Sequence, residues 1–158
     1  MTLERARAAA LRLLKFRPRS ESELKQRLAQ KGFGPAAVEP LVSELKRQGL
    51  LDDTRFARLF VAQQMQARPA GRRMLVSRLR AKGVAAELAT QTVATEAAGE
   101  DELELASRLA AKRAPALEGL PRVAAQRRLF GYLSRRGFSA EIIWKVVREI
   151  VHSSTGSE

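Results

Sequence analysis

Leucines spaced four residues apart, with a glycine four residues further on, recur three times along the chain. Residues four apart lie on one face of an α-helix, and glycine readily adopts the left-handed conformation that ends one. The glycines are 51 and 54 residues apart (83 − 32 and 137 − 83). This spacing predicts an internal repeat of about fifty residues. Its marker residues are Leu24, Leu28 and Gly32, then Leu75, Leu79 and Gly83, then Leu129, Leu133 and Gly137.

Turn residues divide each repeat into three helices. Ser20 and Glu23 form a capping box at one helix start, and Pro18 and Pro69 end the helices that precede them. Pro40 predicts a late or irregular start for the helix near Pro35. No segment alternates between apolar and polar residues as a strand would. The expected helices are 3–16, 21–30, 35–48, 53–67, 72–82, 85–97, 100–113, 122–135 and 140–151.

These helices predict an all-α fold of three tandem three-helix repeats in an elongated array. The first repeat covers residues 1–50, the second 51–99 and the third 100–151. Residues 152–158 are small and polar, and we expect a disordered tail there. The paired leucines should form the core, together with the inward-facing residues Leu11 and Leu14 of the first helix and Phe56, Leu59 and Phe60 of the fourth.

Carboxylates are concentrated at the predicted helix starts. There they can accept backbone N–H bonds and lie near the positive end of the helix dipole. Asp52 and Asp53 could alternatively be read as a metal pair. Adjacent side chains at a helix start point apart, however, and no third ligand is near in sequence. Capping is therefore the preferred interpretation for Glu21, Asp52, Asp53 and Asp101.

Positive charge is abundant and unevenly distributed. The chain has 29 basic and 17 acidic residues, for a formal net charge of +12. No acid lies between Asp53 and Glu87 or from Gly119 to Ala140. Such a strip suits nucleic-acid phosphates or an acidic protein groove, and charge alone does not separate these two partners from a solvated face. The candidate binding residues are Arg68, Arg72, Arg73, Arg78, Arg80, Lys82, Arg127, Arg128, Arg135 and Arg136.

Residues that carry catalysis are scarce. The chain has no cysteine, and its single histidine, His152, lies in the predicted tail. No phosphate-binding glycine loop or zinc-protease motif is present, so the sequence predicts a non-enzymatic protein without cofactor or metal.

No apolar stretch is long enough for a membrane span, and we expect a cytoplasmic monomer. Trp144 is interpreted as packing at a core edge, with base stacking as the alternative.

Four stretches resemble the RecX family, the bacterial regulators of the RecA recombinase. They are RPRSESELKQRLAQKGF, LLDDTRFARLFV, ARPAGRRMLVSRLRAKGV and YLSRRGFSAEIIWKVV. The resemblance covers roughly residues 6–151, and its more specific parts are Asp52-Asp53 with Phe56-Ala57, and Gly71 with Lys82-Gly83.

The resemblance implies three tandem three-helix units and a function. The chain would bind RecA inside the groove of its filament on DNA. It would inhibit filament growth, ATP hydrolysis and strand exchange, and so regulate DNA repair, recombination and the SOS response.

Two alternatives stay open. One is a DNA-binding module that places the helix from Arg72 in a groove without RecA. The other is a scaffold for a different acidic partner.

Overall fold

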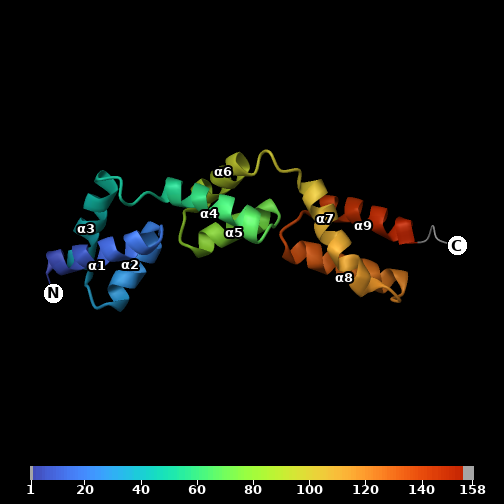
Figure 1. Cartoon of the computed structure of the whole chain (residues 1–158), viewed down its shortest axis with the longest axis horizontal. Coiled ribbons are helices and arrows are strands. Elements are labelled where there is room, and N and C mark those ends of the chain that lie inside the picture. Colours follow the sequence, from blue (N-terminus) through green and yellow to red (C-terminus); the bar gives the residue numbers. More distant parts are fainter. Residues whose placement is uncertain (1, 155–158) are drawn as a thin grey trace. The chain divides into compact units, whose positions relative to one another are not determined.

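The computed structural model describes the backbone of residues 2–154 and the side chains of residues 2–150. Within that range no residue lies in a strand, so the all-α prediction is confirmed. Figure 1 shows the helices in chain order. They are α1 (Leu3–Phe16), α2 (Glu21–Gln30), α3 (Pro35–Arg47), α4 (Asp53–Ala67), α5 (Arg72–Ala81), α6 (Ala86–Glu96), α7 (Glu102–Arg113), the 3₁₀ helix η1 (Ala114–Leu117), α8 (Arg122–Arg135) and α9 (Ala140–Ser154).

The second helix of each repeat ends in the same way. Gly32, Gly83 and Gly137 follow these helices with φ angles of 92°, 85° and 90°, in the left-handed region that glycine adopts without steric cost. The N–H of the next, apolar residue then donates to the carbonyl of the second leucine, which is the Schellman motif. The predicted glycine stops are therefore confirmed. The donor–acceptor pairs are Phe33–Leu28 (3.1 Å), Val84–Leu79 (3.2 Å) and Phe138–Leu133 (3.2 Å).

The paired leucines lie in the core, as predicted. All six are between 0% and 1% exposed, and full burial of a leucine side chain contributes about 1.5–3 kcal/mol. In the first repeat the pair packs with apolar residues of α3, including Leu41 and Leu45. In the third repeat the pair packs with residues of α7 and α9, including Leu105, Ile143 and Val147.

Contacts divide the chain into two compact units. Residues up to Val61 and Arg78–Thr92 form the first unit, and Ala62–Ser77 and the residues from Val93 onward form the second. The helices of the second repeat, α4, α5 and α6, each contribute residues to both units. The N-terminal end of α5 therefore belongs to the second unit and its C-terminal end to the first.

The first helix buries alanines where leucine was expected. Ala6 and Ala10 are fully buried, whereas Leu11 is 37% exposed, which corrects the prediction for that residue. The reason is helical geometry: Leu11 is one residue, or about 100°, away from Ala10 on the helix. Leu14 is half-buried and packs against the core, as predicted.

The fourth helix shows a similar correction. Leu59 is 52% exposed, and the buried face consists of Phe56, Ala57 and Val61. Phe60 is half-buried, and its ring stacks on that of Phe56 with centroids 5.9 Å apart. The prediction for Leu59 rested on its hydrophobicity alone. The small Ala57 occupies the inward-facing position instead.

Two helices differ from the sequence prediction at one end. α3 begins at Pro35 without delay, and Pro40 lies inside it with its side chain exposed. Proline lacks only the one N–H that would bond four residues back. α9 continues to Ser154, past the predicted end at Val151, because no glycine or proline interrupts it. Residues 152–154 are thus helical, contrary to the predicted tail, and residues 155–158 lie outside the described residues.

Trp144 lies at the edge of the core of the third repeat. Its side chain is 45% exposed, and its ring centroid is 5.1 Å from that of Phe130, with a tilt of 45°. Phe130 itself packs against the core of this repeat. This position agrees with the packing interpretation.

Candidate partner-binding surface

Helix α5 carries the basic candidates of the second repeat. Leu75 and Leu79 are fully buried, whereas Arg73 and Arg80 are exposed. Residues seven apart on a helix differ in direction by only about 20°, so these two arginines lie on one face of α5. Neither guanidinium forms an ion pair or hydrogen bond within the part of the chain that the structure describes. Both are therefore available to a partner.

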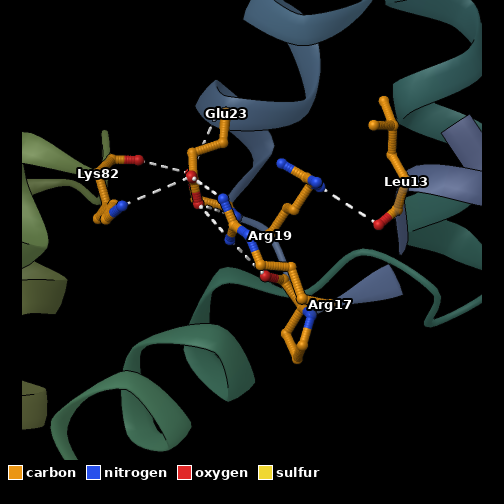
Figure 2. Close-up of polar contacts among 7 residues, drawn as sticks. Leu13, Arg17, Arg19, Glu23 and Lys82 are labelled. Carbon is orange, nitrogen blue, oxygen red and sulfur yellow. Dashed lines mark hydrogen bonds and ion pairs between the residues drawn. The ribbon is translucent and has the colours of Figure 1, made fainter. Parts of the chain in front are cut away.

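Lys82, just after α5, contacts residues at the start of α2. Its carbonyl accepts a hydrogen bond from the Ser20 hydroxyl, and its Nζ lies 3.8 Å from a carboxylate oxygen of Glu23. The same carboxylate forms an ion pair with Arg17 at 2.8 Å. Figure 2 shows Glu23 between these two cations. The Lys82 charge is thus partly neutralised within the protein.

Glu23 is a capping residue and an ion-pair partner at once. Its side chain accepts the backbone N–H of Ser20, and Ser20 caps Glu23 in return, so the predicted capping box is present. Burial raises the pKa of Glu23. Hydrogen bonds from Arg17 and from the Ser20 backbone, with the positive charges of Arg17 and Lys82, lower it by more, so its pKa lies below the ordinary value.

Arg19 is a buried cation that the sequence analysis did not identify. It is 5% exposed, and its Nε donates to the Leu13 carbonyl at 3.2 Å (Figure 2). Burial lowers the pKa of Arg19, the charges of Arg17 and Arg27 lower it further, and Glu23 opposes them. An arginine stays charged in proteins, so Glu23 also serves to balance this buried cation.

Arg72, at the other end of α5, has a structural role. Its backbone N–H donates to Glu102 Oε1 at 2.7 Å, and its Nη2 donates to the Ala97 carbonyl at 3.2 Å. Its Nε is buried without a hydrogen-bond partner among the described residues. One residue earlier, the Gly71 N–H donates to the Arg136 carbonyl at 2.8 Å. Arg72 is therefore committed within the protein, unlike Arg73 beside it.

The acids at helix starts divide into two roles. Asp52 caps its own helix, because it accepts the backbone N–H groups of Thr54 and Arg55. Asp53 instead accepts the backbone N–H of Glu21, at the start of α2, at 2.8 Å. Burial raises the pKa of Asp53, and the hydrogen bond from Glu21 only partly offsets this. The sequence predicted capping here but could not tell which helix each acid caps.

The same division occurs at the start of the third repeat. Asp101 caps α7 through the backbone N–H groups of Leu103 and Glu104. Glu102 caps α5, as described above, in the role that Asp53 plays for α2. Two successive repeats thus use an acid from the next repeat to cap their second helix.

The remaining candidates are distributed over the surface. Arg68 is exposed and Arg78 is half-buried, and each interacts with another group of the protein. In the third repeat Arg127, Arg128 and Arg135 are exposed on α8. Arg136 is half-buried, and its guanidinium lies 5.5 Å from the ring centroid of Tyr132.

The described part of the chain offers no candidate metal site or membrane span. No group of three or more His, Cys, Asp or Glu residues within the described chain is arranged to hold a metal ion. Among the helices that the structure describes, none is both long and apolar enough to cross a membrane.

The fold and this surface define a class: an all-α protein of three tandem three-helix domains with an exposed basic helix. Three family models match it in order. They describe the first three-helix domain of RecX at residues 6–45, the second at 52–93 and the third at 100–147. The chain belongs to the RecX family of regulatory proteins, which are not enzymes.

Relatives and solved structures agree with this assignment. The chain is 36% identical over 146 residues to the regulatory protein RecX of Amycolatopsis mediterranei, covering 92% of this chain and 83% of that one. It is 37% identical over 147 residues to that of Streptomyces coelicolor, covering 93% and 78%. The crystal structure of RecX from Lactobacillus salivarius matches with a TM-score of 0.82 over 94% of this chain and 96% of that one. At 21% identity, that last likeness shows the fold alone.

Proposed function

We propose that this protein regulates RecA by binding RecA and its filament on DNA, mainly as an inhibitor of ATP hydrolysis and strand exchange. Membership of the RecX family supports RecA as the partner. The observation that carries the binding surface is the pair Arg73 and Arg80, exposed on one face of α5 above a fully buried leucine pair. Arg68, Arg78 and Lys82 add positive charge to the same repeat.

Electrostatics explains why such a helix would bind a filament. Arginine guanidinium groups match carboxylates and phosphates with paired hydrogen bonds. An acidic protein groove offers carboxylates, and the DNA within it offers phosphates. Like charges on one short helix repel each other in the free protein. A polyanionic partner removes that repulsion and releases counterions, so binding should weaken as the salt concentration rises.

The test is RecA's DNA-dependent ATPase, measured with increasing amounts of this protein. We expect inhibition by the natural chain. The double variant Arg73→Glu/Arg80→Glu should keep the helical spectrum and need about tenfold more protein, or greater, for the same inhibition. Unchanged inhibition by the double variant would show that this face does not bind the filament.

The chain offers a matched control. Arg5 and Arg12 are also exposed and seven residues apart on one helix, α1. The variant Arg5→Glu/Arg12→Glu makes the same change in net charge and should inhibit as the natural chain does. If both double variants lose inhibition equally, net charge accounts for the effect and Arg73 and Arg80 have no special role.

The alternative function is DNA binding without RecA, and the acid-free stretches of the sequence favour it as the second candidate. Titration of the natural chain against bare single- and double-stranded DNA separates the two. Binding to bare DNA as tight as to the filament, with no gain when RecA is added, would support the DNA-binding module and contradict the proposal.

A further inference from the structure

Four arginines of the third repeat surround one cavity of about 330 Å³. The cavity lies where the end of α7 and η1 meet one face of α8. Arg113 comes from the last position of α7, and the other three arginines come from α8. None of the described residues that line it is acidic. The lining residues that matter here are Arg113, Arg127, Arg128, Gly131, Tyr132 and Arg135.

The register of α8 explains why these side chains converge. Arg128, Gly131, Tyr132 and Arg135 occupy positions i, i+3, i+4 and i+7, which share one face of a helix. Arg127 flanks this face. Leu133 points away from it and is fully buried. The arginines are therefore grouped by helix geometry, on a face fixed by the core.

The positive charges around the cavity are uncompensated. None of the four guanidiniums forms an ion pair with a carboxylate of the described residues. Arg113 lies over the ring of Tyr132, 4.5 Å from its centroid, a cation–π contact that orients it without neutralising it. Clustered cations repel one another, and an anion in the cavity would remove that repulsion.

Gly131 makes room for one of these arginines. A glycine inside a helix costs about 0.5–1 kcal/mol relative to alanine. A Cβ at this position would lie 3.1 Å from Nη1 of Arg135, which is closer than ordinary contact. The glycine thus leaves room for the Arg135 guanidinium against the helix at the cavity wall, and a side chain there would require it to move by a few tenths of an ångström.

We propose that this arginine pocket binds the phosphate group of a phosphate ester. The planar guanidinium fork matches phosphate oxygens with paired hydrogen bonds, and a cavity of this size is at the lower end for small-ligand sites. The phosphate group is the shared chemistry of a free nucleotide and of a nucleic-acid backbone. The pocket requires nothing of the α5 surface, so it is independent of the RecA proposal.

The first test titrates pyrophosphate into the full chain by calorimetry at low, fixed salt. We expect saturable binding at one site. The variant Arg128→Gln/Arg135→Gln should bind about tenfold more weakly or worse. The control Arg5→Gln/Arg12→Gln has the same spacing on α1 and should bind as the natural chain does. The proposal is wrong if the natural chain shows no saturable binding, or if the Arg128/Arg135 variant retains full affinity.

A second variant excludes simple loss of folding. Gly131→Ala should shift the Arg135 guanidinium by a few tenths of an ångström and weaken pyrophosphate binding slightly, while the better helix propensity keeps or raises the melting temperature. Unchanged affinity would contradict the role of Gly131. Competition then identifies the phosphate source: displacement of pyrophosphate by a short single-stranded oligonucleotide points to a nucleic-acid backbone, and displacement by a nucleoside triphosphate alone points to a free nucleotide. RecA is absent throughout, so failure here leaves the ATPase test unaffected.

Discussion

The two ends of α5 are joined to neighbouring helices by the same plan but with different chemical groups. In the first unit, the Ser20 side chain donates to the carbonyl of Lys82. In the second unit, the backbone N–H of Gly71 donates to the carbonyl of Arg136. In both junctions, the residue just before the second helix of one repeat contacts the residue just after the second helix of the next repeat. One junction therefore depends on side chains and the other on close approach of two backbones.

Each kind of junction has its own weakness. The side-chain junction places Glu23 among Arg17, Arg19 and Lys82, so its strength depends on ionisation. The backbone junction is formed by main-chain groups that leave no space: a Cβ on Gly71 would meet the Gly137 carbonyl, and one on Gly137 would meet the Met74 backbone.

The largest effect is expected for Gly137→Ala. The residue has φ of 90°, which costs an alanine about 1–2 kcal/mol, and the added Cβ would collide with the backbone of Met74. Because a backbone clash cannot be relieved by a rotamer change, we expect a total loss of about 3 kcal/mol or more, measured by urea denaturation.

Gly49→Ala is the control for that variant. Gly49 also has a positive φ, of 70°, but nothing lies within 4 Å of its added Cβ. It should lose only the conformational cost of about 1–2 kcal/mol. Equal losses for the two variants would mean that the backbone junction contributes no steric constraint.

A smaller effect is expected from the acids that cap the second helices. Glu102→Ala removes the acceptor for the first N–H of α5, and Asp53→Ala does the same for α2. Loss of a capping acceptor costs about 1 kcal/mol. Glu102→Ala should cost more than Asp53→Ala, because α2 keeps its capping box whereas Gly71, before α5, has no side chain.

Thermal melts of the two alanine variants give this comparison directly. The variant Asp53→Asn should recover most of the loss, since the amide oxygen can still accept the Glu21 N–H. A larger loss from Asp53→Ala than from Glu102→Ala would contradict the view that α2 has the better-capped start.

The repeats and their leucine core could be predicted because their signals are local. Leu24 and Leu28 define a helix face, and Gly32 ends that helix, within nine residues of sequence. The contacts that join the repeats are not local: Asp53 caps a helix that begins 32 residues earlier (53 − 21), and Ser20 bonds to Lys82, 62 residues away. Helical periodicity shows which face is buried but not which residue of a distant helix it meets.

The candidate binding residues show the same difference between local signals and contacts with distant segments. The exposure of Arg73 and Arg80 depends only on their positions on α5, whose Leu75 and Leu79 face the core. The burial of Arg19 and the tethering of Arg72 do not depend on position alone, because each requires a carbonyl group supplied by another segment. Arg127, Arg128 and Arg135 were candidates from the sequence, but their grouping into one pocket was missed for two reasons. Arg113 lies 14 residues before Arg127 in the sequence (127 − 113), and Gly131 has no side chain to attract notice.

The smallest expected effect is a pH dependence at the side-chain junction. The pKa of Glu23 is lower in the folded protein than its ordinary value of 4.5. A lowered pKa means that ionised Glu23 stabilises the fold above about pH 4.5, and that this contribution is lost as the pH falls through the lower, folded value.

Glutamine at this position can still accept the Ser20 N–H in a capping box but carries no charge. Glu23→Gln should therefore be modestly less stable than the natural chain near pH 7 and nearly equal to it near pH 3, as measured by thermal melts across about pH 3–7. Glu87→Gln removes an exposed carboxylate that forms no ion pair with the residues the structure describes, and it serves as the control for loss of one charge. If the difference between the natural chain and Glu23→Gln is the same at both pH values, the charge of Glu23 does not stabilise this junction.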